Sequence, residues 1–203
     1  MKIICIGRNY TKHAVELKSQ VPEKPVFFLK PDSSLLVNNK PFFYPQFSNE
    51  IHHEVEIIVQ INRIGKYIEE KFANRYYNKI GVGIDFTARD LQNEHIKKGL
   101  PWEIAKAFDN SAPVSKFVPI GKFKNINSIN FSLTVNGKIA QQGNTSEMVF
   151  PVDTIISYVS RYFTLKMGDI IFTGTPAGVG PVKIGDHLQA FLEEEKMLDF
   201  YVK

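Results

Sequence analysis

The amino-acid sequence predicts an α+β fold dominated by mixed β-structure with a few short helices. Short apolar runs rich in β-branched residues recur along the chain, and glycine, proline and asparagine separate them, which is typical of strands. Helical spacing of apolar residues occurs only in a few brief segments. A length of 203 residues with 43% hydrophobic residues suits one domain, residues 1–203, with a sizeable core.

The N-terminal part of the chain combines a strand, a short helix and a long irregular stretch. Residues Lys2–Ile6 predict a strand that ends at Gly7, and Tyr10–Leu17 has room for two helical turns. Between Gln20 and Gln46 only Val26–Leu29 has strand character, and prolines are frequent. Such a stretch is typical of a lid or binding loop, so we expect it to build most of a pocket.

Three segments further along predict helices. Glu69–Lys79 suits a short surface helix. Phe86–Lys98 suits another, with Thr87 as its N-cap and Gly99 as its stop. Apolar residues within Pro151–Phe163 keep helical spacing, which predicts an amphipathic helix.

A β-hairpin is the clearest local prediction. Asn136–Gly137 separates two strand-like runs, Phe131–Val135 and Lys138–Gln142, and this dipeptide favours a tight two-residue turn. Two similar pieces, Lys166–Ile170 and Lys183–His187, each predict a turn that opens a strand.

Two acids lie inside the apolar, β-branched run Ile51–Val59. Side chains alternate along a strand, so Glu54 and Glu56 point to one face, where they repel each other unless a cation lies between them. A second strand-like run, Gly81–Phe86, contains Asp85. Three carboxylates form a ligand set for a hard divalent ion, Mg²⁺ or Mn²⁺ first and Ca²⁺ next. The alternative is that both glutamates lie on the hydrated face of an antiparallel sheet.

Two other patterns leave alternatives open. Gly174–Gly180 matches neither nucleotide-binding fingerprint, so it predicts tight turns or a loop that presents N–H groups to an anion. His52 and Glu54, with a distant histidine such as His95 or His187, imitate the two-histidine, one-carboxylate iron site. An iron site of that kind would leave the other two acids unexplained.

Candidate catalytic residues precede and follow these carboxylates. His13 and Glu16 are three residues apart, so a helix would bring them within reach. They are either an ordinary surface pair or a general base oriented by a carboxylate. Lys106 is a cation in the apolar stretch Ile104–Phe108. It either snorkels to the surface or pairs with a carboxylate of a substrate.

The composition of the chain limits which classes of molecule the protein can bind and where it is found. The formal net charge of +4 comes from scattered basic residues, which argues against nucleic acid and leaves anionic small molecules. Cys5 is the only cysteine, so it predicts a small buried hydrophobe and excludes an internal disulfide. No apolar run has the roughly 18 residues of a membrane span. Without a signal-peptide pattern at Met1, we expect a cytoplasmic protein.

Taken in order, the motifs resemble the fumarylacetoacetate hydrolase family. The resemblance is close to its short, single-domain branch of acylpyruvases and oxaloacetate decarboxylases, which also contains 2-hydroxyhepta-2,4-diene-1,7-dioate isomerases. It covers nearly the whole chain and is carried by Gly7–Tyr10, His13, Glu16, Phe28–Pro31, His52–Glu56, Asp85–Asp90, Lys98–Trp102, Ala105–Lys106, Gly168–Ile171 and Gly174–Gly180.

This resemblance implies a fold and a set of roles. The family fold is a mixed β-roll or β-sandwich with short helices, usually a homodimer. From the resemblance to the short branch we expect no counterpart of the extra N-terminal domain of the namesake enzyme, which argues against fumarylacetoacetate as the substrate. The implied roles are metal ligands at Glu54, Glu56 and Asp85, a dyad of His13 and Glu16 on a lid over about residues 11–31, a substrate-contacting lysine beside the metal at Lys106, and substrate contacts at Lys30, Arg89, Gln92 and Thr175.

The expected function is hydrolysis of a carbon–carbon bond in acylpyruvate-type 2-oxo acids. A Mg²⁺ or Mn²⁺ ion would chelate the pyruvoyl group and stabilise the pyruvate enolate that leaves. His13 would activate the attacking water, with Lys106 or Gln92 near the oxyanion. The alternatives are oxaloacetate decarboxylation or tautomerisation, and isomerisation of an unsaturated 2-oxo diacid. A non-catalytic metal-binding module is more distant, because a pure binder needs no base.

Overall fold

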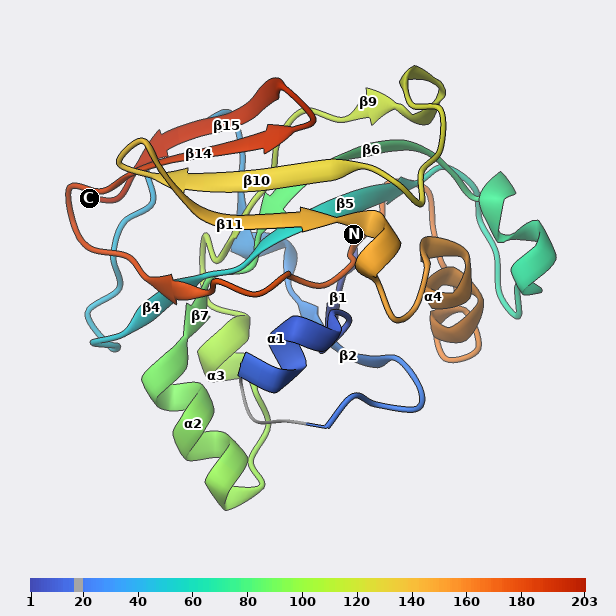
Figure 1. Cartoon of the computed structure of the whole chain (residues 1–203). Coiled ribbons are helices and arrows are strands. Elements are labelled where there is room, and N and C mark those ends of the chain that lie inside the picture. Colours follow the sequence, from blue (N-terminus) through green and yellow to red (C-terminus); the bar gives the residue numbers. More distant parts are fainter. Residues whose placement is uncertain (17–19) are drawn as a thin grey trace.

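The fold in this computed structural model, which describes residues 1–16 and 20–203, is α+β with strands predominating (Figure 1). Its largest sheet has six strands and mixes parallel and antiparallel pairs. In spatial order these strands are β2 (Val26–Lys30), β1 (Ile3–Gly7), β12 (Ile170–Phe172), β5 (Val55–Ile61), β6 (Tyr77–Ile84) and β9 (Val118–Pro119).

A second, antiparallel sheet of four strands lies over β5 and β6 (Figure 1). Its strands in order are β11 (Lys138–Asn144), β10 (Asn130–Val135), β14 (His187–Leu192) and β15 (Glu195–Tyr201). Smaller sheets complete the fold. They are β13 (Gly180–Pro181) with β4 (Ile51–His53) and β7 (Thr87–Ala88), and β3 (Leu35–Leu36) with β8 (Ala112–Pro113).

The core fills the space between the two large sheets. Ile57 of β5 and Leu133 of β10 are both buried in it without solvent exposure. The other face of β5 is buried as well, since Ile58 packs in a smaller cluster with Cys5 and Phe172. Burial on both faces explains why the sequence of β5 is almost continuously apolar. Cys5 is the small buried hydrophobe that the sequence predicted.

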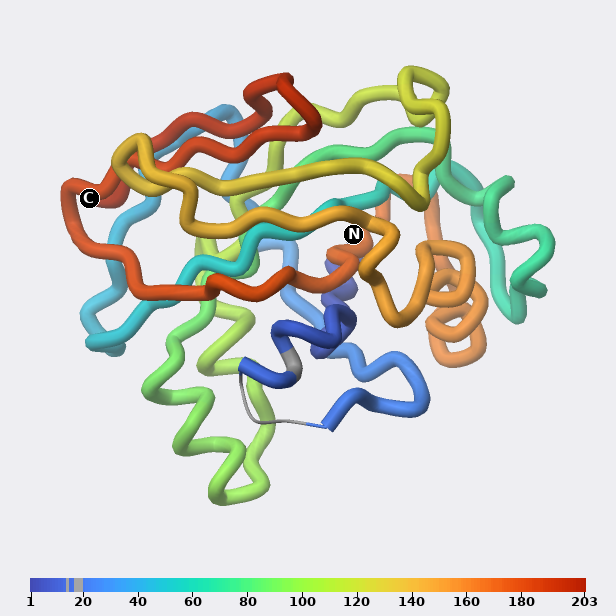
Figure 2. The backbone as a smooth tube through the Cα atoms, viewed as in Figure 1, coloured from blue at the N-terminus to red at the C-terminus, as the bar shows by residue number. Residues whose placement is uncertain are grey.

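The helices are short, and three of them gather at one end of the sheets, as the backbone trace also shows (Figures 1 and 2). The α-helices are α1 (Thr11–Glu16), α2 (Arg89–Lys98), α3 (Glu103–Lys106) and α4 (Val152–Val159). The 3-10 helices are η1 (Asp32–Ser34), η2 (Glu70–Arg75), η3 (Ile120–Lys122) and η4 (Thr145–Glu147). Within the described ranges, no helix is both long and apolar enough to cross a membrane.

Several local predictions are confirmed. β10 and β11 form the predicted hairpin, and Asn136 and Gly137 have positive φ angles of 54° and 76° at its turn. α2 ends at Gly99, whose φ of 64° is left-handed. α4 lies within the predicted amphipathic segment but ends earlier, at Val159.

Two helix predictions need correction. α2 begins at Arg89 and not at Phe86, because Thr87 pairs with His52 in the three-stranded sheet and is therefore no N-cap. Glu69–Lys79 contains only the 3-10 helix η2, since Tyr77 already belongs to β6 and pairs with β5. Long-range strand pairing decides both boundaries. Of the predicted lid, residues 17–19 lie outside the described part of the chain.

Candidate active site

Three carboxylates meet where strands β4, β5 and β6 approach one another. Glu54 occupies the single residue between β4 and β5, Glu56 lies within β5, and Asp85 directly follows β6. Val55 pairs with Ile84, and the Asp85 N–H donates to the Glu54 carbonyl at 2.8 Å. One carboxylate oxygen from each acid lies within 4.8 Å of the others, and all three side chains are buried. The structure thus brings the three predicted metal ligands together.

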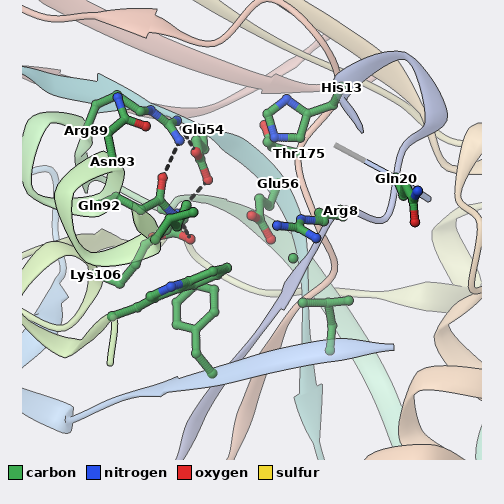
Figure 3. Close-up of a pocket in the computed structure, with 16 residues that line it drawn as sticks. Arg8, His13, Gln20, Glu54, Glu56, Arg89, Gln92, Asn93, Lys106 and Thr175 are labelled. Carbon is green, nitrogen blue, oxygen red and sulfur yellow. Dashed lines mark hydrogen bonds and ion pairs between the residues drawn. The ribbon is translucent and has the colours of Figure 1, made fainter. Parts of the chain in front are cut away.

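Three buried cations surround these acids. Lys106 Nζ lies 2.8 Å from Glu54 Oε2 and 2.8 Å from Asp85 Oδ2. Lys30 Nζ lies 2.8 Å from Asp85 Oδ1, and Arg89 pairs with Glu54 Oε1. Figure 3 shows Arg89 and Lys106 converging on Glu54. Burial of an unpaired charge costs several kcal/mol, so these cations offset the three buried carboxylates.

The two lysines occupy different places in the cluster. Lys106 ends α3, lines the cavity beside the carboxylates and also donates to Thr87 Oγ1 at 2.6 Å. Lys30 ends β2 and has a side chain without solvent exposure. It donates to Ser111 Oγ at 2.9 Å and to the Lys106 carbonyl. Lys30 is not among the residues that line the cavity, so the structure places it behind Asp85 as a counter-ion.

The surroundings of the cluster shift the pKa values of Glu54 and Glu56 in opposite directions. Burial alone would raise the pKa of Glu54, but Lys106 and Arg89 hold that pKa well below its usual value. Burial raises the pKa of Glu56, and the nearby charge of Asp85 raises it further. Burial would lower the pKa of Lys106, whereas Asp85 and Glu54 raise it overall. Glu56 is therefore the acid that the protein's own cations compensate least.

The carboxylate oxygens of the cluster fit a hard divalent cation. Asp85 Oδ1 is buried, and its contact with a described side chain is the ion pair with Lys30 Nζ at 2.8 Å. Glu56 forms no ion pair with a described side chain, and the Gly174 N–H donates to its Oε2 at 2.6 Å. Oxygen ligands alone are typical of Mg²⁺, Mn²⁺ and Ca²⁺ sites. Glu54, Glu56 and Asp85 could hold such an ion.

His13 and Glu16 form a contact on α1. His13 Nδ1 lies 3.2 Å from Glu16 Oε2, and His13 is buried where it lines the cavity of the three acids. Figure 3 shows its ring beside Thr175. The Gly178 N–H donates to Glu16 Oε1 at 3.1 Å. Because Nδ1 faces Glu16, Nε2 is the imidazole atom available for proton transfer.

The glycine-rich segment 174–180 forms the tight turns that its sequence predicted. Gly174 and Gly178 have φ angles of 102° and 97°, and a Cβ on Gly178 would lie 2.5 Å from the Ala140 carbonyl oxygen. These are tight turns that require glycine. The same two residues present their N–H groups to anions, and these anions are the protein's own Glu56 and Glu16.

One cavity of about 440 Å³ joins the three acids and His13. The positions from which substrate contacts were expected line it, except Lys30; they are Arg89, Gln92, Lys106 and Thr175. No role in the site was predicted for the other lining residues, which are Ile6, Gly7, Arg8, Gln20, Phe28, Asn93, Ile96 and Trp102. Only Gln20 and Phe28 come from the described part of the irregular stretch, so the expectation that this stretch builds most of the pocket is wrong.

Arg8 is the most informative of the residues missed. It follows β1 with a φ of 60°, which is uncommon for a residue other than glycine. Buried Asn9 fixes this turn, since its Nδ2 donates to the carbonyls of Thr173 at 2.7 Å and Phe150 at 3.0 Å. Arg8 forms no ion pair with any described side chain. The sequence signal was the abrupt break of a strand at Gly7 by a charged residue.

The histidines of the alternative iron site have other partners. His52 Nε2 lies 2.9 Å from Glu50 Oε1, and His187 Nε2 lies 2.5 Å from Asp199 Oδ1 in the four-stranded sheet. His95 Nδ1 contacts the Pro101 carbonyl. Among the described residues, these histidines do not join Glu54, Glu56 and Asp85 in one ligand group.

Comparison with known proteins identifies the family of this chain. The family model described as fumarylacetoacetate (FAA) hydrolase C-terminal matches residues 2–200. The chain is 44% identical to mitochondrial oxaloacetate tautomerase of Mus musculus over 201 residues, which cover 99% of this chain and 91% of that protein. It is 45% identical to mitochondrial oxaloacetate decarboxylase of Dictyostelium discoideum over 185 residues, which cover 91% of this chain and 85% of that protein.

A solved structure extends the comparison to the fold. Fumarylpyruvate hydrolase of Pseudomonas aeruginosa, solved in complex with Mn²⁺ and pyruvate, superposes with a TM-score of 0.94 and 34% identity. The superposition covers 100% of this chain and 89% of that protein. The model match over nearly the whole chain and the identities above 40% show that this chain is an enzyme of the fumarylacetoacetate hydrolase family.

Proposed function

We propose that this protein acts on oxaloacetate and interconverts its enol and keto tautomers with the help of a divalent cation. From the sequence alone, hydrolysis of acylpyruvates was the first expectation. The relatives named for oxaloacetate are 44% and 45% identical to this chain, whereas the fumarylpyruvate hydrolase is 34% identical. These identities favour the alternative that the sequence analysis placed second.

One observation carries the proposal. A buried group of three acids and a histidine oriented by a carboxylate line the same cavity. Tautomerisation needs only two elements, stabilisation of an enolate and a group that moves a proton. The site offers a candidate for each.

Glu54, Glu56 and Asp85 would hold Mg²⁺ or Mn²⁺. When bound, this cation would supply Lewis-acid stabilisation of the negative charge on the 2-oxo oxygen of the enolate. Lys106 and Arg89 already contact two of the three carboxylates, so they would stay beside the ion and offer N–H donors to the substrate.

His13 would move the proton. In the direction from enol to keto, C3 of the substrate gains a proton while the hydroxyl on C2 loses one, so no co-reactant is needed. His13 Nε2 is the atom that would deliver the proton to C3, because Glu16 holds Nδ1. The hydroxyl of Thr175 would accept a hydrogen bond from the hydroxyl of the enol substrate. The Thr175 hydroxyl donates to the Val55 carbonyl at 2.8 Å and accepts from Gln141 Nε2 at 2.8 Å, which leaves an acceptor for a substrate hydroxyl.

Arg8 supports a dicarboxylic substrate. Oxaloacetate carries a second carboxylate on C3, and a carboxylate in a half-closed cavity needs a cation. Arg8 lines the cavity without a described carboxylate partner. In Figure 3 it lies on the opposite side of Glu56 from Arg89 and Gln92. A guanidinium can bind a carboxylate through two parallel hydrogen bonds.

Decarboxylation of oxaloacetate is the second candidate, and the Dictyostelium discoideum relative favours it. The bond between C3 and C4 would break, CO₂ would leave, and C3 of the pyruvate enolate would take up a proton. This reaction needs the same enolate stabilisation. Hydrolysis of acylpyruvates also needs a water that His13 would activate.

A comparison of substrates tests the proposal. Purified protein with Mg²⁺ is given enol oxaloacetate, and loss of the enol absorbance, release of pyruvate and cleavage of acetylpyruvate and fumarylpyruvate are measured separately. We expect tautomerisation to be the fastest of these reactions. Cleavage of either acylpyruvate with a higher kcat/KM, or no tautomerisation above the rate in buffer, would contradict the proposal.

The organisation of the protein completes the proposal. We propose a single catalytic domain that forms a homodimer in the cytoplasm and takes a small 2-oxo acid as its only partner besides itself. Analytical ultracentrifugation of the purified chain tests the dimer, since a monomer of 23.2 kDa at micromolar concentration would contradict it.

A further inference from the structure

The side chain of Gln141 contacts two parts of the active site without lining its cavity. Gln141 is buried and belongs to β11 in the four-stranded sheet. Its Oε1 accepts from the Val55 N–H at 3.0 Å and lies 2.8 Å from His53 Nδ1. Its Nε2 donates to Thr175 Oγ1 at 2.8 Å and to the Pro176 carbonyl at 3.0 Å. One amide therefore joins two segments more than a hundred residues apart.

Backbone groups fix the orientation of this amide. The Val55 N–H can only donate, and the Pro176 carbonyl can only accept, so Oε1 must face Val55 and Nε2 must face Pro176. A reversed amide would leave both groups buried and unpaired. With four contacts, the hydrogen-bonding capacity of Gln141 is fully used.

These contacts reach the residues next to the proposed metal ligands. His53 and Val55 flank Glu54 on either side, and this is the point where β4 gives way to β5. Thr175 follows Gly174, whose N–H donates to Glu56 Oε2 at 2.6 Å. Gln141 therefore holds the Val55 backbone and the His53 side chain beside Glu54, together with the turn that supports Glu56.

We infer that Gln141 is a positioning residue for the divalent cation, and that it aligns Glu54 and Glu56 by tying the His53 side chain and the Val55 backbone, on either side of Glu54, to the glycine-rich turn. Groups that orient metal ligands typically contribute about 10–100-fold to metal affinity. The inference rests on the metal-binding part of the proposed function and does not depend on the substrate.

Two substitutions separate the contacts of this amide. Gln141→Glu keeps the shape and the acceptor atoms but removes the N–H donors to Thr175 and Pro176. Gln141→Leu removes all four hydrogen bonds at similar volume. Gln142→Glu is the matched control, because it makes the same change at the next residue, whose side chain is exposed. The dissociation constant for Mn²⁺ is measured by titration calorimetry without substrate, and far-UV circular dichroism checks the fold.

We expect both Gln141 variants to bind Mn²⁺ at least about 10-fold more weakly than the unmodified protein, and Gln142→Glu to bind within about twofold of it. Folded Gln141 variants with unchanged Mn²⁺ affinity and only a lower melting temperature would overturn the inference, because Gln141 would then be merely structural. If the unmodified protein itself binds no Mn²⁺, the proposed function fails instead.

A second measurement applies if neither Gln141 variant folds. Hydrogen exchange is followed in the unmodified protein with and without Mn²⁺. β11 supplies none of the proposed ligands, and it meets the glycine-rich turn through Gln141 and through the close approach of Ala140 to Gly178. The inference predicts that Mn²⁺ slows exchange in residues 139–143 together with residues 174–178. Unchanged exchange in residues 139–143 would overturn the inference.

Discussion

The carboxylate of Glu16 accepts a hydrogen bond from the Gly178 N–H at 3.1 Å, and the two residues are 162 positions apart in the chain. The same carboxylate faces His13 Nδ1 at 3.2 Å. Glu16 therefore connects α1 to the turn whose Gly174 N–H donates to Glu56. One turn therefore contacts both Glu16, which orients the candidate base, and Glu56, one of the three candidate metal ligands.

This relationship predicts different effects for two glycine substitutions. Gly178→Ala and Gly185→Ala both place a side chain at a φ of 97°, which costs about 1–2 kcal/mol of folding free energy. A Cβ at Gly178 would also lie 2.5 Å from the Ala140 carbonyl oxygen, whereas one at Gly185 meets nothing within 4 Å. We expect Gly178→Ala to lower both the melting temperature and kcat further than Gly185→Ala. Equal kcat values in the two variants would show that the turn does not set the position of Glu16.

His13→Ala is expected to separate metal binding from proton transfer. Its affinity for Mn²⁺ should stay unchanged, while tautomerisation should slow by about 10²–10⁴-fold, the usual contribution of general acid–base catalysis. Glu16→Ala should change the rate in the same direction, because an unoriented imidazole is a poorer base. Decarboxylation should fall less, since cleavage of the bond between C3 and C4 needs no proton from His13.

The measurement for these variants is kcat for both reactions with saturating Mg²⁺, together with calorimetric Mn²⁺ titration. Equal losses of tautomerisation and decarboxylation in His13→Ala would assign His13 to closure of α1 over the cavity. A loss of Mn²⁺ affinity would place His13 among the groups that hold the ion.

A divalent cation is expected to stabilise the fold. Glu56 lacks a described cation partner, so an ion among the three acids relieves their mutual repulsion. At 100 times its dissociation constant, Mn²⁺ should add about 2.7 kcal/mol to the free energy of unfolding, which corresponds to roughly 5–10 °C in melting temperature. Differential scanning calorimetry with Mn²⁺ and with a chelator measures this shift.

Asp85→Asn should abolish most of that stabilisation and most of the activity together. Asp109→Asn is the control, because it makes the same charge change at an exposed position. A full Mn²⁺ shift in Asp85→Asn would mean that the ion binds elsewhere.

The fold could be predicted where local chemistry decides it. Asn136–Gly137 specifies its hairpin from two residues, and Gly99 ends α2 because its left-handed conformation suits glycine. Neither the start of α2 nor the strand conformation of Lys79 could be predicted, since both depend on strands that pair across long sequence separations. Secondary-structure propensity depends on one segment alone, whereas the strands with which that segment pairs lie elsewhere in the sequence.

The residues of the candidate site also divide into those that the local sequence reveals and those that it does not. Glu54 and Glu56 reveal their common face by spacing, and His13 with Glu16 reveals a helical pair. Gln141 could not be identified, because its partner Val55 lies 86 residues away and nothing in its own strand marks it. The spacing of charged residues along a strand or helix predicts which of them lie together. It does not predict which neutral side chains hold them in place.

Lys30 is expected to contribute to stability more than to substrate binding. Its side chain is fully buried against Asp85, and removal of one partner from a buried ion pair costs about 3–5 kcal/mol. Lys30→Met should therefore lower the melting temperature strongly, while the KM of the folded fraction changes little. Lys24→Met, at an exposed position, is the control. A large rise in KM at normal stability would support the substrate contact that the resemblance implies.

We expect Arg8 to bind the substrate and to lower the free energy of unfolding. Arg8→Gln should raise the KM for oxaloacetate about 10–100-fold, because a hydrogen bond to a charged group contributes about 1.5–3 kcal/mol. Inhibition by pyruvate, which lacks the second carboxylate, should stay unchanged. Arg8→Gly should raise KM similarly and yet increase the free energy of unfolding by about 1 kcal/mol, since glycine adopts the φ of 60° without strain. Steady-state kinetics and thermal unfolding of the two variants measure both effects. If Arg8→Gly gains stability but keeps the KM for oxaloacetate, the arginine does not bind the second carboxylate, and the cavity must select its substrate by other means.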